Sequence, residues 1–167
     1  KYYKRNIIPA KGLFLVAGMD VQKDRFEIEI VAFGRKRECY SVDYRVIHGG
    51  PESESAWKKV ASLLEEEFEH ENSAPMKIIG LGIDSGYATN EVYTFARGYQ
   101  YPRVIPVKGV ESMKQPLGTP NLVDISMSGK TIKRGVKILP VGVSVIKAQY
   151  YTYLRHEQWT KGSDIPV

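Results

Sequence analysis

The sequence predicts an α/β domain with a mixed β-sheet, in which three antiparallel strands are followed by parallel strands, flanking helices and an added hairpin. First, an apolar run at residues 13–21 and an alternating run at 26–33 are joined by four residues, which favours antiparallel pairing. Second, an amphipathic helical segment follows these strands. Third, a later apolar run precedes a helix and another strand, the order typical of a parallel βαβ unit.

The antiparallel part is expected to follow a basic arm. Residues 1–12 end in turn-forming residues and are predicted to be a linker or extended arm, ahead of a domain over residues 13–167. Because the chain starts without Met and ends abruptly, we expect it to be a domain excised from a longer protein. The run at 13–21 has few polar breaks, as in a central strand buried on both faces.

Period-two alternation marks the second strand, where we expect Glu27 and Glu29 to be solvated. A third strand is predicted over residues 38–47, rich in β-formers. It carries the chain's single cysteine, Cys39, which we expect to pack within the sheet. One cysteine excludes an internal disulfide and a cysteine-based zinc cage.

The remaining elements follow from caps, periodicity and breakers. Ser53 or Ser55 can cap the first helix, whose acidic C-terminal half we expect to be solvated. Pro106 should place its strand near a sheet edge or end. In chain order we predict a helix from Ala56, a strand over 76–83, a helix over 90–97 ending at Gly98, a strand over 103–107, a hairpin of 122–127 with 131–138, and a helix over 143–154.

Two carboxylates end predicted strands, Asp20 after the first apolar run and Asp84 after the second. If these strands lie side by side, the two acids meet at one edge of the sheet. Phosphodiester cleavage needs an activated water and a stabilised oxyanion, which two divalent metal ions can provide. Mg²⁺ and Mn²⁺ sites need few carboxylates. We therefore predict Asp20 and Asp84 as catalytic and metal-binding residues.

A structural alternative exists for each acid. Asp20 can cap the turn at Gln22, and Asp84 can form an Asx turn in its Asp-Ser-Gly segment. Asp24 is expected to be a turn former that could reach a metal ion through water. Near Asp84, glycines would allow close approach of substrate, and Ser85 could help to orient a phosphate.

Charge suggests a nucleic-acid partner. The net charge is +5, and the segment from Lys108 to Lys137 holds six Lys or Arg against two acids. We expect it to follow the phosphates of double-stranded DNA. The predicted DNA-binding residues are Lys108, Lys114, Lys130, Lys133 and Arg134. No apolar run is long enough to span a membrane, and neither a Walker loop nor a serine triad is apparent.

Several motifs together resemble a known family. AGMDVQKDRFEIEIVAFG, from Ala17, is similar to the run that opens the nuclease segment of the lambda-type (GpA family) phage terminase large subunit. GIDSG, VYTFAR, RVIPVKG and VGVSVIKAQYYTYL follow in the same order as in that family. The element order likewise resembles the ribonuclease H-like fold.

This resemblance implies an endonuclease that cuts concatemeric viral DNA during packaging in the host cytoplasm. It implies Asp20 and Asp84 as metal-binding acids, and basic positions at Lys108 and Lys147. Implied partners are an ATPase motor domain on the same full-length chain, a small terminase subunit and a portal, with no membrane.

Two departures from the family pattern matter. Relatives often carry an acid at the place of Ser144, and a third metal acid is expected beyond Val167, with Asp164 as a possible substitute. The resemblance therefore implies that the domain is incomplete at its C-terminal end, and that the isolated fragment cuts weakly or not at all. The alternatives are a non-catalytic ribonuclease H-like module that binds DNA or protein, and a resolvase- or transposase-like nuclease.

Overall fold

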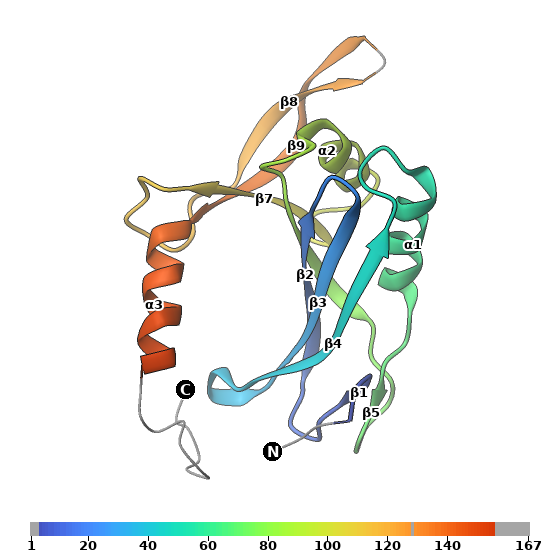
Figure 1. The fold of residues 1–167 in the computed structure, drawn as a ribbon, viewed down its shortest axis with the longest axis vertical. Coiled ribbons are helices and arrows are strands. Elements are labelled where there is room, and N and C mark those ends of the chain that lie inside the picture. Colours follow the sequence, from blue (N-terminus) through green and yellow to red (C-terminus); the bar gives the residue numbers. More distant parts are fainter. Residues whose placement is uncertain (1–3, 128, 156–167) are drawn as a thin grey trace.

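The chain folds around a seven-stranded mixed sheet (Figure 1). The computed structural model describes residues 4–127 and 129–155. Their elements are β1 (Ile7–Ile8), β2 (Phe14–Val21), β3 (Arg25–Phe33), the 3₁₀ helix η1 (Arg35–Arg37), β4 (Cys39–His48), α1 (Glu54–Glu65), β5 (Glu69–His70), β6 (Ile78–Asp84), α2 (Thr89–Arg97), β7 (Val104–Val110), β8 (Asn121–Met127), β9 (Lys130–Gly142) and α3 (Val143–Arg155).

The sheet has the strand order β4-β3-β2-β6-β7-β9-β8. The pairs β2–β3 and β3–β4 are antiparallel, whereas β2–β6, β6–β7 and β7–β9 are parallel. Strands β8 and β9 form the added antiparallel hairpin, which projects beyond the rest of the sheet (Figure 1). The predicted fold class is confirmed, including the parallel β6–α2–β7 unit.

One face of the sheet is buried and the other is open. In β2, Leu15, Ala17 and Met19 point into the core, while Phe14 and Asp20 alternate onto an exposed face. The expectation that this strand is buried on both faces was wrong. The reason is that α1 and α2 pack on one face only, and α3 stands away from the sheet on the side opposite α1 (Figure 1).

Helix α1 follows its sequence signals. The Ser53 hydroxyl accepts a hydrogen bond from the amide of Ala56 at 3.3 Å, so the predicted cap is confirmed. Trp57 packs between Phe26 and Phe95, with ring centroids 4.6 and 4.7 Å apart. These rings join α1, α2 and β3. The helix contributes its buried side chains to the core: Ala56, Val60, Leu63 and Leu64.

Two local expectations were wrong. Pro106 is buried in β7, which lies inside the sheet between β6 and β9. Pairing of β7 with β9 starts only at Val107, so the missing amide hydrogen of Pro106 removes no hydrogen bond from that ladder. Cys39 is exposed, because β4 is an edge strand and this residue begins it.

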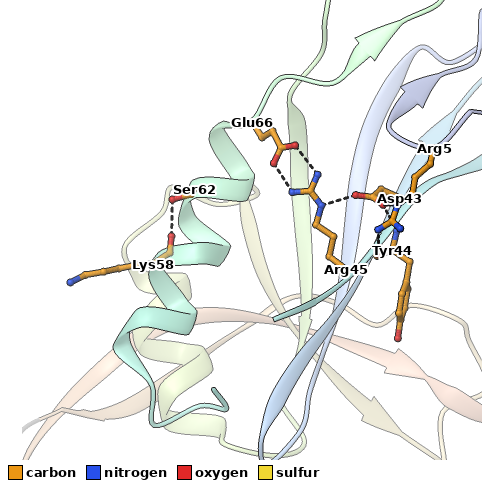
Figure 2. A network of polar contacts seen from close by, with 7 residues as sticks. All are labelled: Arg5, Asp43, Tyr44, Arg45, Lys58, Ser62 and Glu66. Carbon is orange, nitrogen blue, oxygen red and sulfur yellow. Dashed lines mark hydrogen bonds and ion pairs between the residues drawn. The ribbon is translucent and has the colours of Figure 1, made fainter. Parts of the chain in front are cut away.

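The N-terminal arm is anchored to the sheet by packing and by ion pairs. Ile8 is fully buried, and β1 pairs with β5. Arg5 donates to the carboxylate of Asp43 at 2.6 Å (Figure 2). Burial raises the pKa of Asp43, but hydrogen bonds from Arg45 and Arg5 outweigh it and leave this pKa below its usual value.

The same network reaches the end of α1. Arg45 donates to Asp43 at 2.6 Å and makes two hydrogen bonds to the Glu66 carboxylate, at 2.6 and 2.7 Å (Figure 2). Glu66, expected to be solvated, is therefore part of a structural ion pair. Its partner lies on β4, so the pair ties the C-terminal end of α1 to the sheet.

Candidate active site

Asp20 and Asp84 lie next to each other at the carboxyl edge of two parallel strands. Met19 on β2 is paired with Ile83 on β6, and Asp20 and Asp84 are the next residues on the two strands. Both side chains are exposed on the open face. Adjacent strands are about 4.8 Å apart, which places the two carboxylates within reach of a common ion. The predicted adjacency of the strands is confirmed, and the roles of the acids stay a prediction.

Each carboxylate also makes a local turn contact. The side-chain amide of Gln22 donates to Asp20 Oδ2, and the amide of Gly86 donates to Asp84 Oδ1 at 3.0 Å. These are the contacts that the structural alternative predicts. Among the described residues the other oxygen of each carboxylate accepts no hydrogen bond. The turns therefore orient both side chains and leave one oxygen of each for a ligand.

Glycines form the surface directly beside the acids. Gly18 and Gly82 are paired in register, one step along the open face from Asp20 and Asp84. A Cβ at Gly18 would meet no atom within 4 Å, and one at Gly82 would lie 3.8 Å from Val107. Packing therefore does not require glycine at either position. The paired glycines leave a side-chain-free floor, which we call the glycine floor, beside the two carboxylates.

This donor set suits a hard divalent cation. Within the described part of the chain, no group of three or more His, Cys, Asp or Glu residues is placed to hold a metal ion. Mg²⁺, however, uses one or two carboxylates and completes its shell with water and substrate phosphate. Asp20 and Asp84 fit that requirement, as they would for Mn²⁺. Asp164 lies outside the described residues.

A third acid, Glu27, stands opposite Asp20 on β3. It was expected to be solvated, but its two oxygens accept hydrogen bonds from Tyr44 and Arg25, both at 2.7 Å. The Tyr44 hydroxyl, followed by Arg25, lowers the pKa of Glu27. The four-residue turn before β3 already fixes the pairing of Glu27 with Asp20, so this neighbour could have been found from the sequence. Glu29, in contrast, is exposed as expected.

Ser85 does not face the site. It is fully buried, and its hydroxyl donates to the carbonyl of Val107 at 2.8 Å. The expectation that it helps to orient a phosphate was therefore wrong. Its hydrogen bond instead ties the end of β6 to β7. This contact holds the strand that carries Asp84.

The predicted DNA-binding residues gather mainly on the hairpin. Lys130, Lys133 and Arg134 are exposed on or near the part of β9 that pairs with β8 (Figure 1). Lys114 is exposed in the loop after β7. Lys108 is exposed too, but strand alternation sends it to the face opposite Val107, the neighbour of Asp84. The structure thus groups three of the five predicted residues on the hairpin, and their role stays a prediction.

No helix in the described residues is long and apolar enough to cross a membrane.

Comparison with known proteins identifies the domain. Residues 1–164 match the family model of the terminase large subunit gpA, endonuclease domain. The chain is 28% identical over 149 residues to the terminase large subunit of Enterobacteria phage P21, covering 89% of this chain and 22% of that protein. It is 28% identical over 145 residues to that of Escherichia phage lambda, covering 86% of this chain and 22% of that protein.

The chain thus spans about a fifth of the length of these relatives. No solved structure matches it significantly. The seven-stranded mixed sheet is compatible with a ribonuclease H-like nuclease fold, as the element order predicted. With a family model that covers nearly the whole chain, this protein belongs to the family of the terminase large subunit gpA endonuclease domain.

Proposed function

We propose that this chain is a metal-dependent DNA endonuclease domain that hydrolyses phosphodiester bonds of DNA during viral DNA packaging. Asp20 and Asp84 would bind the metal ions. The single observation that carries the proposal is the register of β2 and β6, which sets two exposed carboxylates side by side at one sheet edge. Family membership supports the nuclease class. The two relatives are terminase large subunits.

The chemistry follows from the donor set. Asp20 and Asp84 would bind Mg²⁺ or Mn²⁺ through the oxygens that their turn contacts leave available. When bound, two such cations supply an activated water and stabilise the leaving oxyanion. The glycine floor would let the DNA backbone approach the acids. The exposed hairpin would contact phosphates of double-stranded DNA without reading sequence, which makes binding sensitive to salt.

The proposal extends to the biological setting. The substrate would be concatemeric viral DNA in the host cytoplasm. An ATPase motor domain on the same full-length chain, a small terminase subunit and a portal would be the partners. These partners follow from the family, whose relatives are terminase large subunits.

Plasmid nicking in Mn²⁺ tests the catalytic assignment. Asp20→Asn and Asp84→Asn in the full-length protein should each lower the rate about a hundredfold or more, as loss of a transition-state contact typically does. Glu67→Gln, which neutralises an exposed acid away from the site, is the matched control. Wild-type rates in both aspartate variants would refute the proposal.

A non-catalytic DNA- or protein-binding module remains the second candidate, favoured by the turn contacts of Asp20 and Asp84. Thermal unfolding in increasing Mn²⁺ separates the two. At a hundred times its Kd, a bound ion should stabilise the fold by about 2.7 kcal/mol, or about 5–10 °C in Tm for a domain of this size. No Mn²⁺-dependent shift, or an equal shift in Asp20→Asn, would favour the binding module.

A further inference from the structure

Arg25 is a cation placed beside the acidic pair. It lies on the open face of β3, two residues before Glu27, which is itself directly opposite Asp20. Arg25 is therefore the diagonal cross-strand neighbour of Asp20, about 7 Å away and within reach of long side chains. Among the described residues it is the one Lys or Arg at an open-face position of β2, β3, β6 and β7.

The guanidinium of Arg25 is held by two acids. Its Nε donates to Glu27 Oε1 at 2.7 Å, and a terminal nitrogen lies 2.7 Å from the same oxygen. The other terminal nitrogen donates to Asp24 at 3.0 Å. These contacts use three of the five N–H groups of the fork, so one donor remains on each terminal nitrogen. The Arg25 side chain is 37% exposed, so part of it is accessible from solvent.

A second layer of contacts holds Glu27. The hydroxyl of Tyr44 donates to its other oxygen at 2.7 Å. This bond raises the pKa of Tyr44, and the charge of nearby Asp20 adds a smaller contribution in the same direction. Tyr44, Glu27 and Arg25 thus form a chain of contacts across β4 and β3 that ends beside Asp20. As a purely structural device this partly exposed ion pair would contribute little to the stability of the fold.

The charges around the site make a cation there useful. Asp20, Asp84, Asp24, Glu27 and Glu29 all lie on this edge or face, and together they would repel a DNA strand. Divalent cations at the acidic pair would offset part of that repulsion. A neighbouring phosphate would still need a protein donor. The planar fork of arginine makes paired hydrogen bonds to phosphate that a lysine cannot reproduce.

We propose that Arg25 contacts a backbone phosphate of the DNA strand bound at Asp20 and Asp84, and that Glu27 and Tyr44 position its guanidinium. The inference rests on the proposed function and adds a phosphate-contacting residue outside the basic hairpin. Arg25 is the group that touches the substrate. Glu27 and Tyr44 act through it as positioning residues.

Binding and cleavage are measured in the full-length protein with a short fluorescein-labelled DNA duplex. Arg25→Gln should weaken DNA binding in Ca²⁺ about tenfold, as loss of a charge-assisted hydrogen bond does. It should also reduce the slope of log K against log salt by about 1, the value for one phosphate contact. Arg25→Lys should retain most of the binding but lose kcat, because the charge remains and the fork does not. Tyr44→Phe should weaken binding less, in the same direction.

Matched controls keep the test specific. Arg35→Gln removes an exposed arginine from the β3–β4 connection, at the end of β3 opposite Arg25, and should change nothing. Millimolar guanidinium ion should partly restore cleavage in Arg25→Ala, a rescue that a purely structural role would not give. Melting temperatures should agree among all variants, since the ion pair is exposed. Binding by Arg25→Gln that equals that of Arg35→Gln would overturn the proposal.

The outcome also separates this inference from the proposed function. Weak DNA binding by Arg25→Gln together with full cleavage by Asp20→Asn would reject the catalytic role of the acids and retain the phosphate contact. Normal binding by Arg25→Gln together with an inactive Asp20→Asn would reject the contact and retain the acidic site.

Discussion

Filling the glycine floor should separate stability from activity. In Gly18→Ala the new methyl group would meet no atom within 4 Å, and in Gly82→Ala it would make an ordinary contact of 3.8 Å with Val107. Neither glycine has a positive φ. Alanine at a position with a compatible backbone stabilises a protein by about 0.4–1 kcal/mol, because it restricts the unfolded chain. For a domain of this size that corresponds to a rise of about 1–4 °C in Tm.

The same methyl groups should impair cleavage. They would stand on the open face one step from Asp20 and Asp84, in the space through which the DNA backbone would approach. We expect each substitution to lower kcat/KM at least about tenfold, which is about 1.4 kcal/mol of transition-state stabilisation. Two measurements are needed on each variant, urea unfolding for stability and nicking of a supercoiled plasmid in Mn²⁺ for activity.

Gly80→Ala is the matched control. It lies on the same strand and face as Gly82 but farther from the acids, and its Cβ would sit 3.8 Å from the carbonyl of Pro102. It should leave cleavage unchanged. Full activity in Gly18→Ala and Gly82→Ala would refute the role of the floor. A loss of more than about 1 kcal/mol in stability would instead refute the packing argument.

Two further predictions concern the anchor of the arm and the hairpin. Asp43→Asn should cost about 2–3 kcal/mol in urea unfolding at neutral pH, below the 3–5 expected for a fully buried pair, because Arg5 is 71% exposed although the Asp43 side chain is 1% exposed. The pKa of Asp43 in the folded protein lies below its unfolded value of about 3.9. The stability that ionised Asp43 contributes is therefore present above the unfolded pKa and is lost as the pH falls through the folded pKa. A cost of Asp43→Asn that does not change with pH would contradict the argument. Neutralising Lys130, Lys133 and Arg134 together should reduce the slope of log K against log salt by about 2–3 without changing Tm. The control variant lacks three exposed lysines elsewhere, Lys36, Lys58 and Lys59. Equal slopes in the two variants would exclude the hairpin from DNA binding.

The adjacency of Asp20 and Asp84 could be predicted because it depends on local signals. The four-residue turn fixes β2 against β3, and the helix between β6 and β7 requires a parallel crossover. With β6 beside β2, acids at the two strand ends must meet. Which face of the sheet stays open could not be predicted, because the apolar run of β2 includes Phe14 on the exposed face. Whether that face of β2 is buried depends on which face the helices pack against, and the sequence of the strand does not encode this.

Ion-pair networks escaped prediction for a different reason. Arg5 and Asp43 are 38 residues apart, and Arg45 and Glu66 are 21 apart. No spacing rule links such residues, since their meeting depends on the complete sheet. The sequence pattern therefore places the acids after α1 in solvent, although Glu66 pairs with Arg45 on β4. Alternation alone likewise places Glu27 in solvent, because it does not reveal Tyr44, the diagonal neighbour on β4 that donates to Glu27.

The separation of charge across the fold predicts how binding and chemistry divide. Acids surround the edge that carries Asp20 and Asp84, while exposed cations gather on the hairpin. Contacts made by the hairpin would be present in the bound and transition states alike, so their loss should raise KM and leave kcat nearly unchanged. Loss of Asp20 or Asp84 should lower kcat, because in the proposed function these groups hold the metal ions that act on the reacting phosphate. An equal fall of kcat in hairpin and aspartate variants would mean that the hairpin takes part in the chemical step.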